Sequence, residues 1–125
     1  MNAVLVDSDV AIEVLRNRDK AIRSRWAEMA AGETHIMYSP VTVAEIWHGV
    51  REGEQLAVRA WFEAMICVPV DASIAIKAGE YLRRFHRSHG VELGDALIAA
   101  TAAIHGLQLW TRNKKHYPMT EIQLC

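Results

Sequence analysis

Three acidic residues of the sequence lie beside apolar segments, where folding can bring them together. Asp7 directly follows a short apolar run, Glu45 lies within a mostly apolar segment, and Asp95 directly precedes the most apolar segment of the chain. Carboxylates held close together repel one another, and one or more becomes protonated unless a cation neutralises them. Oxygen ligands of this kind suit Mg²⁺ or Mn²⁺. The three acids therefore indicate a divalent-metal site.

Each of these acids also has a purely structural explanation, which the sequence leaves open. Asp7, or Ser8 or Asp9 beside it, can cap the helix that follows. Asp95 can cap its own helix and interact favourably with the helix dipole. Glu45 lies on the face of its helix opposite the apolar stripe, which is the usual place of a solvent-exposed acid.

The segment 111–117 combines hydroxyl, amide, basic and imidazole groups directly after another apolar run. Its basic residues can contact a phosphodiester backbone while a metal ion offsets the neighbouring carboxylates. His116 in such a loop is most often solvated, a phosphate contact being the second possibility and a metal ligand the third. The basic residues within 16–25 and 83–87 are expected to form solvated faces.

The composition favours one globular domain spanning residues 1–125. The chain has 125 residues, 51% hydrophobic and 23% charged, which is enough apolar mass for one core. Lys and Arg total 14 against 15 for Asp and Glu, a formal charge of −1. No global positive field therefore attracts nucleic acid, and any polyanion must be held by local charge or by metal.

The cysteines and the N-terminus favour a cytoplasmic protein. Cys67 lies in an apolar run and is expected in the core, and Cys125 is the last residue, so the two form no disulfide framework. No basic region precedes the first apolar run as in a secretory signal, and no segment approaches the ~20 apolar residues that span a bilayer. No membrane association is expected.

Alternating apolar runs and amphipathic segments predict an α/β fold. Strands are expected at 3–6, 34–38, 66–70 and 107–111, with a possible fifth at 122–124. Helices are expected at 10–15, 20–31, 40–48, 54–65, 74–86 and 94–105, the last of them buried. This order predicts three layers, in which a largely parallel sheet of four or five strands is flanked by helices. Ligands of such folds bind at the carboxyl ends of the strands.

Four segments resemble, in order, the motifs of PIN-domain ribonucleases, with the closest similarity to VapC-type toxins of bacterial toxin–antitoxin pairs. They are 4–10, 43–49, 94–102 and 109–117. The resemblance implies a PIN-like fold and a Mg²⁺- or Mn²⁺-dependent endoribonuclease acting on single-stranded or loop RNA. It also implies a cognate antitoxin as partner and a homodimer.

The resemblance also implies site residues. Asp7, Glu45 and Asp95 match the family's catalytic acids, and Asn113 matches a position that is commonly Asn or Asp. Many members have a fourth acid where this chain has His116, so Asp7 and Asp95 are the expected metal ligands. The residues expected to contact the substrate are Ser8, Thr111, Arg112, Lys114 and His116.

Two alternatives remain at this point. Asp7-Ser8-Asp9 after a first strand also occurs in aspartyl-phosphate phosphatases of the haloacid dehalogenase type, in which Asp7 would be the nucleophile and Asp9 the general acid. The other alternative is a PIN-like module that only binds a partner.

An antitoxin tail is expected to cover an apolar groove for which Trp26, Met29 and Trp47 are candidates.

Overall fold

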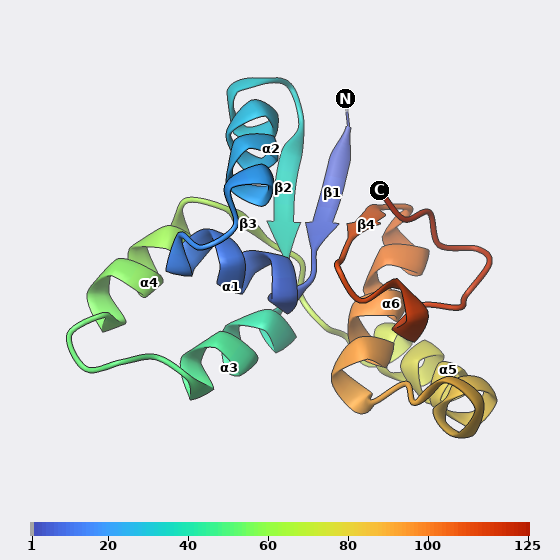
Figure 1. Ribbon diagram of the computed structural model, residues 1–125. Coiled ribbons are helices and arrows are strands. Elements are labelled where there is room, and N and C mark those ends of the chain that lie inside the picture. The colour runs from blue at the N-terminus through green and yellow to red at the C-terminus, as the bar shows by residue number, and fades with distance from the viewer. Residues whose placement is uncertain (1) are drawn as a thin grey trace.

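A four-stranded sheet forms the centre of the protein. The computed structural model describes residues 2–125, and Figure 1 shows the arrangement of the elements. The strands are β1 (Ala3–Val6), β2 (His35–Tyr38), β3 (Ile66–Cys67) and β4 (Gln108–Trp110). They pair in the order β3-β2-β1-β4, and all three pairings are parallel. The predicted parallel α/β fold is therefore confirmed.

The helices begin and end near the predicted positions. They are α1 (Ser8–Arg16), α2 (Lys20–Ala31), α3 (Pro40–His48), α4 (Gln55–Glu63), α5 (Ala72–His89), α6 (Leu93–His105) and the short 3₁₀ helix η1 (Lys114–His116). Ser39 caps α3 by accepting from the Val41 amide at 3.1 Å, and Gly106 ends α6 in the left-handed conformation. Within residues 2–125, no helix is both long and apolar enough to cross a membrane.

Two apolar clusters cover the two faces of the sheet. Leu5 points to one face, where it joins a cluster built mainly from α5 and α6. Val4 and Val6 point to the other face, where α1 to α4 pack. Figure 1 shows these two groups of helices on opposite sides of the strands. The result is the expected three-layer architecture.

The third strand is shorter and more exposed than expected. Only Ile66 and Cys67 pair with β2, and the ladder ends after the Val68 amide donates to the Tyr38 carbonyl at 2.8 Å. Val68 lies opposite Ser39, so the next ladder bond would be donated by the residue after Ser39, and this residue is Pro40, which has no amide hydrogen. Because β3 lies at the edge of the sheet, Cys67 is exposed, and its predicted place in the core is wrong.

The possible fifth strand is reduced to one isolated bridge. Leu124 pairs in parallel with Leu109, supported by hydrogen bonds from Leu109 to Gln123 and from Cys125 to Leu109. Ile122 is buried in the cluster of α5 and α6. The C-terminal segment thus closes the β4 edge without adding a full strand.

The strand order defines where a ligand site is expected. From β1 the chain continues to β2 and β3 on one side and returns with β4 on the other side. The connections leaving β1 and β4 therefore diverge, which makes the carboxyl ends of these two strands the topological switch point. The Asp7 amide joins the two ends by donating to the Trp110 carbonyl at 2.9 Å.

Shortening Leu5 tests the packing of this sheet. Leu5 is 0% exposed, so Leu5→Ala should lower the free energy of unfolding by about 3 kcal/mol, measured by urea denaturation. Leu56 is 84% exposed on α4, and Leu56→Ala should change it by only about 0.5 kcal/mol. Equal effects of the two substitutions would contradict the packing described.

Candidate active site

Asp7 is the buried centre of the site. It follows β1 directly and caps α1, with its Oδ1 accepting from the Ser8 amide at 2.8 Å. Its Oδ2 accepts from the Thr111 hydroxyl and from the Tyr117 hydroxyl, each at 2.8 Å. Burial raises the pKa of Asp7, and these three hydrogen bonds oppose that rise. The capping role and a place in the site therefore coexist in this residue.

Glu45 reaches the site from α3. The Ser8 hydroxyl lies 2.7 Å from Glu45 Oε1 and 3.1 Å from the Thr42 hydroxyl, so Ser8 links α1 to α3. Partial burial raises the pKa of Glu45, and the charges of Asp7 and Asp95 raise it further. Although Glu45 lies opposite the apolar stripe, its face of the helix thus adjoins the other two acids.

Asp95 lies in the first turn of α6 and also serves as a cap. Its Oδ2 accepts from the Glu92 amide at 3.1 Å. The start of α6 packs closely against α3. A Cβ atom at Gly94 would lie only 3.5 Å from Glu45 Oε2. The negative charge of Asp95 contributes to the raised pKa of both other acids. Folding therefore gathers the three predicted acids at the switch point.

The residues after β4 complete the edge of the site. Asn113 Nδ2 lies 2.8 Å from His116 Nδ1, and the same imidazole nitrogen lies 3.4 Å from Asp95 Oδ2. The Asn113 amide donates to the Thr111 hydroxyl at 2.9 Å, which fixes the turn before η1. Asn113, His116 and Thr111 thus lie where they were expected.

The two basic residues expected to bind substrate differ in their surroundings. The Arg112 guanidinium is 3.1 Å from the Glu13 carboxylate, which also pairs with Arg18 at 2.8 Å. Lys114 is exposed on η1. Arg112 is therefore held against α1 by an acid, whereas Lys114 is exposed to solvent.

Asp9 has a larger role at the site than a cap. Its Oδ2 accepts from the Arg112 amide at 3.0 Å, which ties α1 to the segment after β4. Within the described residues, its buried Oδ1 has no hydrogen-bond partner. Burial and the neighbouring charge of Asp7 raise the pKa of Asp9 to about 6.

Sequence reasoning missed Tyr117 and Thr42. Tyr117 is 4% exposed, and its hydroxyl bonds to Asp7 across 110 positions of sequence. Thr42 is fully buried beside Ser8. The only local signal for Tyr117 is an aromatic residue at the end of a polar loop, since such residues usually anchor the loop in the core.

The donor chemistry of the site fits a hard divalent cation. Asp7, Glu45 and Asp95 supply only oxygen, and each of the first two has its pKa raised by the charge of the third. A cation would relieve this repulsion. Within residues 2–125, no three or more His, Cys, Asp or Glu side chains are grouped so that they could hold a metal ion. An ion bound by two of these carboxylates would take its remaining ligands from water, as Mg²⁺ commonly does.

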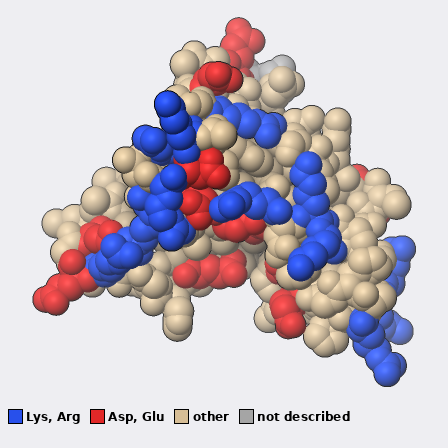
Figure 2. Space-filling model, in the orientation of Figure 1, with Lys and Arg blue, Asp and Glu red and all other residues tan. Residues whose placement is uncertain are grey.

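Acidic and basic side chains lie next to one another on one face of the molecule. Figure 2 shows acidic atoms near the middle of this face, with Lys and Arg side chains beside them. The formal charge of the whole chain is −1, so this basic border is a local feature. Basic side chains gathered on one face can hold a polyanion.

Comparison with known proteins identifies the family. A family model described as the PIN domain matches residues 4–121. The chain belongs to the PIN-domain family. It is 40% identical over 120 residues to Ribonuclease VapC10 of Mycobacterium tuberculosis, a match that covers 94% of this chain and 88% of that protein. It is 32% identical over 117 residues to Ribonuclease VapC1 of Methanocaldococcus jannaschii, covering 91% and 78%.

Solved structures show the same PIN fold. A chain in the crystal structure of DNA-bound VapBC from Salmonella typhimurium has a TM-score of 0.81 at 20% identity, covering 100% of this chain and 98% of that one. A chain of VapBC-1 from nontypeable Haemophilus influenzae has a TM-score of 0.78 at 22% identity, covering 98% and 96%. Because the PIN-domain model matches residues 4–121, the alternative of an aspartyl-phosphate phosphatase is excluded.

The raised pKa values of this PIN-domain site predict how stability depends on pH in metal-free buffer. The folded state holds the Asp9 proton up to about pH 6, whereas the unfolded state releases it near 3.8. The stability that protonation contributes is therefore present below pH 3.8 and lost as the pH rises to about 6. Asp9→Asn should reduce the fall in unfolding free energy between pH 4 and 7 by about 1 kcal/mol, measured by urea denaturation with a chelator.

The comparison is made between the two pH profiles rather than at one pH. Asn at position 9 keeps an oxygen that can accept from the Arg112 amide. Parallel profiles for the wild type and Asp9→Asn would show that the Asp9 carboxyl is not desolvated as described.

Proposed function

We propose that this protein is a Mg²⁺- or Mn²⁺-dependent endoribonuclease that hydrolyses single-stranded or loop RNA and acts as the toxin of a toxin–antitoxin pair. The observation that carries the proposal is the meeting of Asp7, Glu45 and Asp95 at the switch point of a PIN-domain sheet. The names of its relatives, Ribonuclease VapC10 and VapC1, support the reaction class. A purely binding module would not need the Asp7 and Glu45 carboxyls, whose pKa values burial raises, beside the charge of Asp95.

The residues divide into metal ligands and residues that position them. Asp7 and Asp95 are the ligands in this proposal, because each is held by hydrogen bonds at the end of an element. The bound cation would lower the pKa of a water molecule and neutralise charge that develops on the phosphoryl oxygens. Asn113 holds the His116 ring beside Asp95.

Glu45 is the better placed of the acids to accept a proton from the attacking water. It accepts one side-chain hydrogen bond, from Ser8, and its pKa is raised. Asp7 accepts three hydrogen bonds, so fewer positions of its carboxylate are free to take up a proton. A base with a pKa nearer the working pH combines the correct protonation state with enough driving force for proton transfer.

Hydrolysis by this site leaves a 5′-phosphate and a 3′-hydroxyl. The water oxygen bonds to phosphorus, the bond to the 3′-oxygen breaks, and the 3′-oxygen takes up a proton. His116 lies beside Asp95, and in this proposal His116 and the exposed Lys114 of the same 3₁₀ helix contact the phosphates of the scissile strand. Ser8 and Thr111 act by orienting Glu45 and Asp7, and Arg112 contributes through the backbone contact to Asp9.

Removing the Asp95 charge tests the proposed reaction. Asp95→Asn keeps an oxygen for the Glu92 amide but removes a metal ligand, so cleavage of a single-stranded RNA in Mn²⁺ should fall at least about 100-fold. Asp71→Asn, at the cap of α5, is the matched control and should retain activity. A chelator should abolish cleavage by the wild type. Full metal-dependent cleavage by Asp95→Asn would overturn the site assignment.

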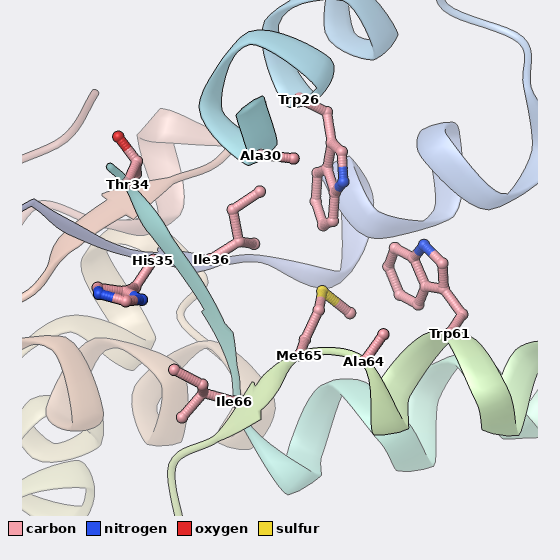
Figure 3. Close-up of a pocket in the computed structure, with 9 residues that line it drawn as sticks. All are labelled: Trp26, Ala30, Thr34, His35, Ile36, Trp61, Ala64, Met65 and Ile66. Atoms are coloured by element: carbon pink, nitrogen blue, oxygen red, sulfur yellow. The ribbon is translucent and has the colours of Figure 1, made fainter. Parts of the chain in front are cut away.

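The proposed antitoxin is expected to bind the apolar groove between α2, α4 and β2. A cavity of about 380 Å³ lies there, and Figure 3 shows the Trp26, Trp61 and Met65 side chains pointing toward one another in it. The two indole rings stack with centroids 5.3 Å apart. Of the three candidate residues, Trp26 lines this cavity, whereas Trp47 lines a separate cavity between α3 and α4 and Met29 packs against the core.

The groove offers what a short amphipathic partner segment needs. Its walls are mostly apolar, with Thr34 and His35 as polar members, and large side chains of a partner can enter a cavity of this size. Antitoxin neutralisation is part of the same proposal, since the similar solved structures are named as VapBC complexes. A homodimer of the PIN domain is proposed with it.

Filling the groove should separate toxicity from neutralisation. Ala64 is exposed and lines the cavity, so Ala64→Arg should leave RNA cleavage and growth arrest intact but weaken rescue by the product of the neighbouring gene. Ala75→Arg, on an exposed position of α5, should be rescued like the wild type. Rescue is measured as colony count on co-expression, and equal rescue of both variants would place the antitoxin elsewhere.

A further inference from the structure

The Tyr117 hydroxyl occupies an acceptor position on one oxygen of the Asp7 carboxylate. It donates to Asp7 Oδ2 at 2.8 Å, and the Thr111 hydroxyl donates to the same oxygen at 2.8 Å. A carboxylate oxygen has about two lone-pair positions for acceptance. Both positions on Oδ2 are therefore used by the chain itself, and Oδ2 has none left for a cation.

The other oxygen of Asp7 is only partly used. Oδ1 accepts one hydrogen bond, from the Ser8 amide at 2.8 Å. It therefore keeps one lone-pair position. Asp7 can offer a cation one oxygen from this side chain, and a bidentate contact would require the loss of a buried hydroxyl bond.

The Tyr117 ring is fixed well enough to impose this restriction. Its side chain is 4% exposed and belongs to the apolar cluster of α5 and α6. Its amide donates to the Lys114 carbonyl at 3.0 Å, which holds the residue at the end of η1. The neutral phenol hydroxyl is the donor of this bond, because the Asp7 carboxylate oxygen can only accept.

We propose that Tyr117 is a positioning residue that limits Asp7 to one-oxygen coordination and so makes the site select Mg²⁺ or Mn²⁺ over Ca²⁺. The selectivity follows from the coordination habits of the ions. Mg²⁺ requires a compact octahedron at short distances, whereas Ca²⁺ takes six to eight oxygens and commonly binds carboxylates through both. This inference rests on the metal site of the proposed function.

The test compares ion affinities of the metal-free full-length chain without RNA. Isothermal titration calorimetry gives the Kd for Mn²⁺ and for Ca²⁺ in the wild type and in Tyr117→Phe, which removes only the hydroxyl. We expect the wild type to prefer Mn²⁺. We expect the ratio of the Ca²⁺ Kd to the Mn²⁺ Kd to fall about fivefold in the variant, because Oδ2 becomes free to bind.

Tyr81→Phe is the matched control. Tyr81 is 1% exposed, lies in the same apolar cluster, and also donates its hydroxyl to a carboxylate, that of Glu121. Both variants thus lose one hydroxyl–carboxylate bond made by a buried tyrosine ring, and urea denaturation measures the loss of stability in each. Only Tyr117→Phe should change the ion ratio.

Three results would overturn the inference. The first is an unchanged ratio in Tyr117→Phe, even if both affinities fall, and the second is an equal change in Tyr81→Phe. The third is no Mn²⁺ binding by the wild type, which would also remove the metal site of the proposed function and so differs from the first two. If Tyr117→Phe does not fold, Thr111→Val removes the other donor to Oδ2 and should lower the ratio in the same way.

Discussion

The site depends on one buried carboxylate that joins the two strands on either side of the topological switch point. Asp7 follows β1, its amide bonds to the end of β4, and its Oδ2 accepts from Thr111 directly after β4. Removing this carboxylate from water is costly, and three hydrogen bonds offset only part of the cost. The same arrangement that places Asp7 beside Glu45 and Asp95 therefore leaves an electrostatic demand that a cation can satisfy.

The structural and functional explanations of the acids turn out to be compatible. Asp7 caps α1 and Asp95 takes part in the capping of α6, yet both belong to the gathered acids. A cap occupies part of a carboxylate and holds it in one orientation, which a metal ligand also requires. The sequence could not decide between the two explanations because a cap position is compatible with both.

Local patterns predicted the elements and the ends that carry Asp7 and Asp95, because strand runs and caps are short-range signals. They failed where long-range packing decides. The apolar residues around Cys67 predict a place in the core. They carry no information on the strand order, which puts β3 at the exposed edge of the sheet. Glu45 lies beside the other acids because α6 packs close to α3. Tyr117 contacts Asp7 only after the whole chain has folded.

A crystal structure grown with Mn²⁺ tests the central claim most directly, since anomalous scattering locates the ion without assumptions about the site. The account predicts one ion about 2.1 Å from Asp7 Oδ1, with Asp95 as a second protein ligand and water in the remaining positions. Strong anomalous density elsewhere, or a saturated crystal in which Asp7 and Asp95 contact only protein atoms, would contradict it.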